Sequence, residues 1–165
     1  MQDVYYPSSN ILEVFMGQSL SNLLTHIIFS TKNRQPLIRH DIEIRLHSYI
    51  RAICQDHESH LLQIGGMADH IHMLVNLSRK HALSKFVNEI KSHSSKWVKT
   101  IDDDFRDFAW QAGYGAFSVG QLEYQKVIDY ISNQKEHHKG LSFQEEYLRF
   151  LKGYQIKYDE KYLWE

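Results

Sequence analysis

The pattern of apolar and polar positions predicts a strand and then a helix near the beginning of the chain. The run 23–30 is apolar and rich in β-branched residues, so it predicts a central strand that ends at the polar turn 31–36. Apolar residues then recur at positions 42, 46, 50 and 53, a helical spacing. This spacing predicts an amphipathic helix over residues 41–57.

The rest of the chain continues this alternation. In order, its patterns predict a hairpin of strands at 61–67 and 70–77, a second helix at 82–99, a strand or ordered loop at 108–119, a third helix at 121–138 and a short helix at 142–152. Strand, helix, hairpin, helix and strand is the order of a ferredoxin-like, RRM-like α+β sandwich. We therefore expect an antiparallel sheet with helices on one face and additional C-terminal helices.

Length and composition set broad bounds on this fold. A chain of 165 residues can bury one core, so we expect a single domain over 16–165, preceded by an unassigned leader at 1–15. The lone cysteine, Cys54, forms no internal disulfide, which fits a reducing cytoplasm. We expect no membrane span, because no apolar run approaches the ~20 residues that a span needs.

Two histidines separated by one residue are the first candidate for chemistry. In a strand, side chains two apart point to the same face, so His70 and His72 would present both imidazoles together. That arrangement suits a metal ion. The alternative is that both histidines simply lie on a solvated strand face.

Tyr130 and Gln134 form the second candidate. A spacing of four on a helix stacks the phenol and the amide one turn apart. On the same helix the residues that should face the core are Tyr124, Val127, Ile128 and Ile131. Tyr130, Gln134 and His137 fall on the flank of that stripe, which selects Tyr130 over Tyr124 as a nucleophile. The alternatives are a boundary tyrosine, an exposed glutamine, and a histidine that only complements the helix C-terminus.

The two candidates together suit phosphodiester transfer by a tyrosine. That reaction needs an oxygen nucleophile, a divalent cation that withdraws charge from the phosphate, and a rigid frame that joins them. A formal net charge of −1 argues against a protein that coats nucleic acid by charge alone. Any DNA contact must therefore come from a local group of cations, for which the candidates are Lys32, Arg34, Lys85, Lys91, Lys96 and Lys99. A solvated lysine face is the alternative.

These residues in this order resemble the single-strand DNA transposases of the insertion sequence 200/605 family, which are HUH (His-hydrophobe-His) endonucleases. The resemblance runs from about Met16 to the C-terminus. It rests on the segments 19–34, 69–75, 113–119, 130–138 and 143–147.

The resemblance implies a metal site and a reaction. His70, His72 and Gln134 would hold Mg²⁺ or Mn²⁺, and Tyr130 on its C-terminal helix would be the nucleophile. From its position on the same helix flank, His137 is a candidate auxiliary group near the phosphate. The implied substrate is single-stranded DNA that carries a hairpin, cut and rejoined through a 5′-phosphotyrosine. The family also implies a homodimer in which the tyrosine helix of one subunit completes the histidine site of the other.

Three other interpretations remain open from the sequence. A host-adopted relative that processes hairpins would use the same residues. An RNA-binding module on the same scaffold predicts aromatic residues on the central strands, where His70 and His72 lie instead. A metal-free phosphoesterase with two His-x-Thr/Ser motifs lacks its hydroxyl residues here, at His26 and at His70.

Overall fold

The computed structural model describes residues 19–137, 140 and 142–164, so the predicted leader at 1–15 lies outside the described residues. The strands are β1 (Leu24–Ser30), β2 (His60–Met67), β3 (His70–Asn76) and β4 (Gly115–Ser118). The α-helices are α1 (His40–Asp56), α2 (Leu83–Val98), α3 (Tyr124–Ser132), α4 (Gln134–His137), α5 (Phe143–Gly153) and α6 (Glu160–Leu163), with short 3-10 turns η1 (Lys32–Arg34) and η2 (Asp103–Phe105). Among the described residues, no helix is long and apolar enough to cross a bilayer.

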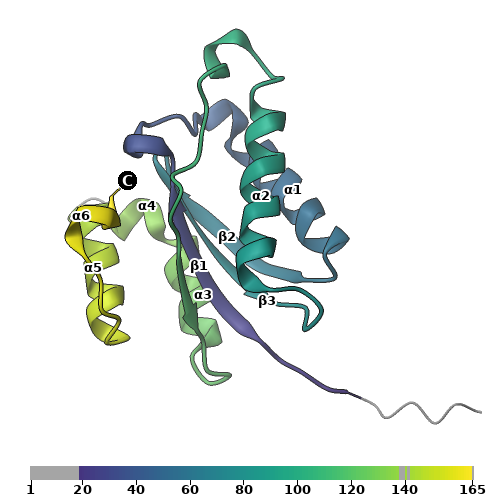
Figure 1. Ribbon diagram of the computed structural model, residues 1–165, viewed down its shortest axis with the longest axis vertical. Coiled ribbons are helices and arrows are strands. Elements are labelled where there is room, and N and C mark those ends of the chain that lie inside the picture. Colours follow the sequence, from purple (N-terminus) through teal and green to yellow (C-terminus); the bar gives the residue numbers. More distant parts are fainter. Residues whose placement is uncertain (1–18, 138–139, 141, 165) are drawn as a thin grey trace, which may run out of the picture.

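The strands form one antiparallel sheet in the order β2-β3-β1-β4. Helices α1 and α2 lie on one side of this sheet, and α3 and α5 lie on the other (Figure 1). The predicted ferredoxin-like sandwich is confirmed, together with the additional C-terminal helices. The predicted bounds of the first two helices and of the hairpin agree with the structure to within one residue.

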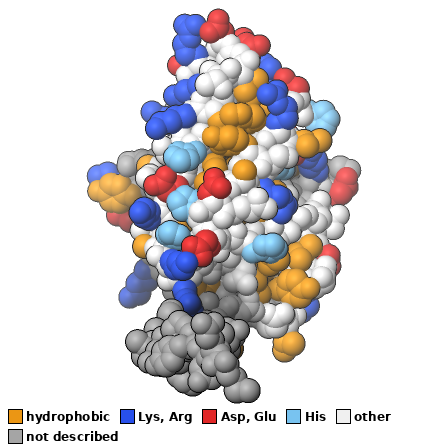
Figure 2. Space-filling model, turned by 90° about the vertical axis from the view of Figure 1, so that its right-hand side faces the viewer, with side chains coloured by type: hydrophobic (Ala, Val, Ile, Leu, Met, Phe, Trp, Pro, Cys, Tyr) orange, Lys and Arg blue, Asp and Glu red, His pale blue; other side chains and the backbone are white. Residues whose placement is uncertain are grey.

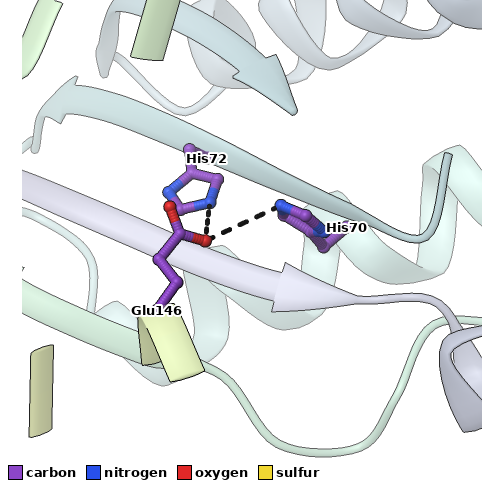
Figure 3. A group of neighbouring side chains, drawn as sticks. All are labelled: His70, His72 and Glu146. Atoms are coloured by element: carbon purple, nitrogen blue, oxygen red, sulfur yellow. Dashed lines mark ion pairs between the residues drawn. The ribbon is translucent and has the colours of Figure 1, made fainter. Parts of the chain in front are cut away.

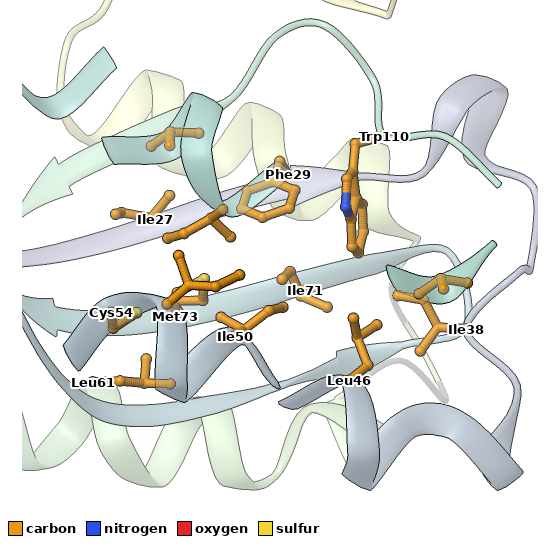
Figure 4. Close-up of a cluster of buried hydrophobic side chains, with 14 of the residues drawn as sticks. Ile27, Phe29, Ile38, Leu46, Ile50, Cys54, Leu61, Ile71, Met73 and Trp110 are labelled. Carbon is orange, nitrogen blue, oxygen red and sulfur yellow. The ribbon is translucent and has the colours of Figure 1, made fainter. Parts of the chain in front are cut away.

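The side of the sheet under α1 and α2 holds the main apolar core. Alternate residues of the two central strands point into it, among them Ile27, Phe29, Ile71 and Met73, all at most 2% exposed. They meet the apolar stripe of α1, which includes Leu46, and a matching stripe of α2 (Figure 4). Period-two burial on the strands and helical periodicity on the helices thus define one interface.

The intervening residues of the same strands point to the other side. Ile28 joins a smaller apolar cluster there with Phe117 of β4 and three residues of α5, which are Phe143, Tyr147 and Leu151. His26, His70 and His72 lie on this side as well, each at most 2% exposed. Helix α5 therefore covers a face that carries polar groups.

Two predicted elements differ from the structure. The helix expected over 121–138 is divided into α3 and α4 at Asn133, whose φ and ψ of −100° and 18° are not helical. The Asn133 side chain donates to the Asp129 carbonyl at 2.8 Å, so the asparagine competes with the backbone pattern as this residue type often does. The sequence predicts a strand or an ordered loop over the segment 108–119. Only β4 within it is a strand, and Trp110 contributes an isolated bridge to Thr31.

Candidate active site

The two histidines of β3 meet a carboxylate from α5. His70 and His72 are 1% and 0% exposed, and the buried Glu146 reaches them from across the interface (Figure 3). Glu146 Oε2 lies 3.3 Å from His72 Nε2 and 3.9 Å from His70 Nε2. One ligand atom from each of the three residues falls within 4.8 Å of the others, a spacing that could hold a metal ion.

The outer nitrogen of each histidine ring has a partner of its own. His70 Nδ1 lies 2.7 Å from Asp69 Oδ1, and His72 Nδ1 lies 3.0 Å from His26 Nε2. Such outer contacts commonly fix the ring orientation and tautomer of metal-binding histidines. Here they leave both Nε2 atoms directed toward Glu146.

Burial and neighbouring groups set the charge of these outer partners. Burial, with a smaller effect of His72, lowers the pKa of His26 to about 3, so His26 is neutral near pH 7. Burial alone would raise the pKa of the Asp69 carboxyl, but its hydrogen bond with His70 and the charge on that ring outweigh this effect. The pKa of Asp69 is therefore lowered, and an anion supports His70.

Tyr130 and Gln134 contact the same carboxylate from the opposite side. The Tyr130 hydroxyl donates to Glu146 Oε1, and Gln134 Nε2 donates to that oxygen at 2.9 Å. One oxygen of Glu146 thus faces the phenol and the amide, and the other faces the two imidazoles. Gln134 Oε1 is buried and accepts no hydrogen bond from any described residue.

A glycine in β2 lets the tyrosine helix approach the sheet. A Cβ atom at Gly65 would lie 2.5 Å from the Ile131 carbonyl oxygen of α3. Gly65 is the register partner of His72, so this close approach occurs beside the histidine pair. The ring of Tyr130 lies 5.9 Å from that of His72 in consequence. Of the stripe predicted to face the core, Ile131 is buried and the other three residues are half-buried.

The electrostatics keep the phenol protonated and the carboxylate ionised. Burial raises the pKa of Tyr130, and the hydrogen bond to Glu146 and its negative charge raise it further. Burial alone would raise the pKa of Glu146, but hydrogen bonds and charge from His72, Tyr130 and Gln134 lower it overall. A positive charge beside the phenol is therefore the change that would favour a phenolate.

The other predicted site residues are distributed between both sides of the sheet. His137 is exposed, and its ring centroid lies 4.9 Å from that of Tyr130. Lys85, Lys96 and Lys99 are exposed on or next to α2, on the far side of the sheet from the histidines. On the surface that includes this side, Figure 2 shows cationic, acidic and histidine side chains interspersed rather than one uniform basic patch.

The remaining cations have different surroundings. Lys32 is exposed and Arg34 is half-buried in η1, directly after β1. The charge of Arg34 acts on Asp69, so η1 lies near the site. Lys91 instead donates its ammonium to the backbone carbonyls of residues 111, 112 and 113, at 3.0, 3.2 and 2.5 Å. Burial lowers the pKa of Lys91 to about 8.

Sequence reasoning did not assign Glu146, Asp69 or His26 to the site. Asp69 could have been found, because it immediately precedes His70 in a tight turn. Glu146 lies within the segment 143–147 that carried part of the resemblance, but its approach to β3 is a long-range contact. A capping box of Ser142 and Glu145 starts α5 and so fixes where Glu146 begins to face the sheet.

The site has a His-hydrophobe-His pair on a central strand and a tyrosine held beside it by a helix, which is the arrangement that the resemblance to HUH transposases implies. The family model described as "Transposase IS200 like" matches residues 19–134. The chain is also 31% identical over 124 residues to the transposases for insertion sequence element IS200 of Salmonella typhimurium and Salmonella typhi, over 72% of this chain and 80% of each relative.

The chain therefore belongs to the IS200-like transposase family. Two solved structures share its fold. A candidate transposase from Deinococcus radiodurans R1 matches with a TM-score of 0.57 and 22% identity, over 72% of this chain and 96% of that one. A REP-associated tyrosine transposase bound to a REP hairpin matches with a TM-score of 0.57 and 15% identity, over 75% and 73%.

Proposed function

We propose that this transposase cleaves and rejoins single-stranded DNA through a covalent link to Tyr130. The observation that carries the proposal is the position of Glu146. Its carboxylate joins the nucleophile and the histidine pair in one buried group, with the phenol on one oxygen and the imidazoles near the other. Few structural roles for a lone tyrosine would require that combination.

The residues present fit a divalent cation. His70 and His72 offer nitrogen ligands, and Glu146 offers an anionic oxygen. The acceptor oxygen of Gln134 is buried without a hydrogen bond from a described residue, as a ligand awaiting a cation would be. We therefore propose that Glu146 joins His70, His72 and Gln134 in the ligand set. Carboxylate and amide oxygens suit Mg²⁺ and Mn²⁺, and the imidazoles favour Mn²⁺.

When bound, such a cation would withdraw charge from the attacked phosphate. The oxygen of Tyr130 forms a bond to phosphorus while the bond from phosphorus to the 3′ oxygen breaks. The phenolic proton passes to Glu146, the acceptor that it already contacts. The leaving 3′ oxygen takes up a proton from water, so the products are a 5′-phosphotyrosine and a 3′-hydroxyl. Because the phosphodiester energy is retained, a second DNA end can displace the tyrosine.

The proposed substrate is single-stranded DNA next to a hairpin. The relatives from Salmonella are transposases for an insertion sequence, and one structural neighbour was solved with a hairpin bound. The surface candidates for DNA contact are Lys32, Arg34, Lys85, Lys96 and Lys99, because Lys91 is engaged with backbone carbonyls.

A separate proposal concerns which subunit of a homodimer supplies the residues of each site. The resemblance implies that two subunits share their sites. Within one chain, Tyr130 donates to Glu146, whose other oxygen lies 3.3 Å from His72 Nε2. We propose a homodimer whose sites each form within one subunit. A mixture of His72→Ala and Tyr130→Phe proteins should then form no DNA adduct. Recovery of the adduct in the mixture would establish shared sites, and sedimentation would measure the dimer itself.

The deciding experiment incubates the protein with labelled hairpin oligonucleotides from the flanks of its own gene, with Mn²⁺ or with EDTA. A denaturing gel should show a covalent adduct that requires the metal and is absent in Tyr130→Phe. Tyr124→Phe is the matched control on the same helix and should retain the adduct. Tight binding of the oligonucleotides without an adduct in any metal would instead indicate a non-catalytic binding module.

A further inference from the structure

A cavity opens directly beside the proposed nucleophile. It has a volume of about 460 Å³ and lies between α5 and the helices α3 and α4. Its lining is formed by Tyr130, His137, Glu146, Arg149, Phe150, Gly153 and Tyr154. This volume falls within the range of ~300–1,000 Å³ that is usual for small-molecule sites.

We propose that this cavity holds one unpaired nucleotide of the DNA strand next to the phosphate attacked by Tyr130, with Arg149 on its phosphate and Phe150 and Tyr154 against its base. The inference deepens the proposed function and rests on it. It assigns a role in DNA recognition to Arg149 and Phe150 of α5 and to Tyr154, which directly follows that helix.

Arg149 is available for a phosphate. Its side chain is exposed and makes no hydrogen bond or ion pair with any other described residue. It lies three residues after Glu146, so both side chains project from one side of α5. The charge of Arg149 also reaches Tyr130, where it opposes the rise in the phenol pKa. A phosphate bound at Arg149 would therefore lie close to the nucleophile.

The aromatic wall is held in place by the sheet. Phe150 stacks on Phe117 of β4 with ring centroids 5.2 Å apart and lies edge-on to His26 at 5.1 Å. The Tyr154 hydroxyl donates to the Ser118 carbonyl at 3.0 Å, yet 45% of that residue stays exposed. Gly153, which lies between them in the lining, contributes no side chain that could fill the space. The wall is therefore anchored to β4 and leaves part of Tyr154 open to a flat ligand.

The chemistry of this lining selects a nucleotide over other ligands. A cation beside aromatic rings is the combination with which proteins hold single strands, because every base has a face that can stack. The strand cut at Tyr130 must also pass the mouth of this cavity. A chain with a net charge of −1 can hold such a strand only through local cations of this kind.

The test measures binding in EDTA, so that no cleavage contributes. The probes are fluorescent (dT)12 and a 12-unit abasic phosphodiester of equal charge. We expect Tyr154→Leu to weaken binding of (dT)12 roughly fivefold or more and to leave the abasic probe unchanged. Tyr154→Phe loses the bond to Ser118 but keeps the ring and its packing on Phe117, with centroids 4.9 Å apart, so it should bind much closer to the wild type than Tyr154→Leu does. Arg149→Gln should weaken binding of both probes and reduce the slope of log affinity against log salt by about 0.7.

Two exposed neighbours outside the lining provide matched controls. Lys152→Gln removes a cation one turn from Arg149, and Tyr158→Leu removes a ring that is 44% exposed. Both should bind the probes like the wild type. Equal losses from Lys152→Gln and Arg149→Gln, or from Tyr158→Leu and Tyr154→Leu, would overturn the proposal. A 4-thiothymidine probe should crosslink to the 149–154 segment, and crosslinks confined to α2 would overturn it as well.

The two proposals fail in different ways. If no variant changes (dT)12 binding while the wild type still forms the covalent adduct, the nucleotide site is wrong and the transposase reaction stands. If the binding losses occur as expected but no metal yields an adduct, the cavity binds DNA and the reaction is wrong.

Discussion

The two faces of the sheet are equally buried but differ in what they bury. On β3, Ile71 and Met73 point toward α1 and α2, whereas His70 and His72 point toward α5, and all four are at most 1% exposed. Burial alone therefore does not separate core from site in this protein. The two faces differ in their partners, because Ile71 and Met73 belong to the apolar core cluster and the imidazoles contact Asp69, His26 and Glu146.

Buried polar groups on the two faces also differ in whether their hydrogen bonds are satisfied. Ser94 of α2 is fully buried, and its hydroxyl donates to the Ile90 carbonyl while it accepts from Trp110 Nε1 at 2.9 Å. These bonds satisfy the groups locally. On the α5 face, Gln134 Oε1 is buried without a donor among the described residues. An acceptor left in this state favours binding of a cation over a purely structural role.

The largest expected effect comes from His72→Ala. Loss of a metal ligand should lower the yield of covalent DNA adduct at least about a hundredfold, because a bound cation supplies several kcal/mol to phosphoryl transfer. Adduct formation in Mn²⁺ on a denaturing gel is the measurement. His60→Ala, on the exposed start of β2, is the control and should retain activity. Full activity in His72→Ala would contradict the proposal that His72 binds a metal needed for the reaction.

The neighbouring change Met73→Ala tests the other face. It should cost about 2–5 kcal/mol in the free energy of unfolding, because it leaves a cavity in the apolar core. Urea unfolding measures this cost. At a temperature where the variant is folded, its adduct yield should stay near that of the wild type. A large loss of activity without a loss of stability would mean that the two faces are not separable in this way.

Gly65→Ala should affect the site face through the backbone of α3. The added methyl group would meet the Ile131 carbonyl, so α3 must shift and carry Tyr130 away from Glu146. We expect a loss of about 1–3 kcal/mol in stability and a larger relative loss of adduct. Gly113→Ala is the control, since nothing lies within 4 Å of its added Cβ. Equal adduct yields from the two variants would show that the close approach at Gly65 does not position the tyrosine.

The smallest effect concerns Lys91 and pH. Its pKa is lowered to about 8 in the folded chain, against an ordinary value of 10.5, so the unfolded chain binds more protons between these values. Stability from this group should therefore increase as pH rises from about 8 to 10.5. Urea unfolding across that window should show a shallower increase in Lys91→Met than in the wild type. An unchanged pH dependence, or a loss of DNA affinity with normal stability, would return Lys91 to the DNA-binding set.

Periodicity predicted the sheet well because one face of each central strand is apolar. Alternation placed His70 and His72 on one face, and the spacing of Tyr130 and Gln134 placed both on one flank of their helix. The break at Asn133 was missed because a side chain bond to Asp129 overrides the local helical pattern. Glu146 was missed because its role depends on how α5 docks, and no local spacing encodes that contact. The sequence predicts Lys91 as a surface cation, because no local pattern shows that its ammonium donates to the carbonyls of residues 111–113.

The position of α5 in the chain also affects when the site can form. The segment that matches the family ends at Gln134, so it contains the histidines and the tyrosine but not Glu146. During synthesis the sheet and the tyrosine helix leave the ribosome before α5 does. A nascent chain of that length holds the histidines and the tyrosine but still lacks the carboxylate that joins the two halves of the candidate site. The candidate site is therefore complete only after α5 has been synthesised and has docked on the sheet.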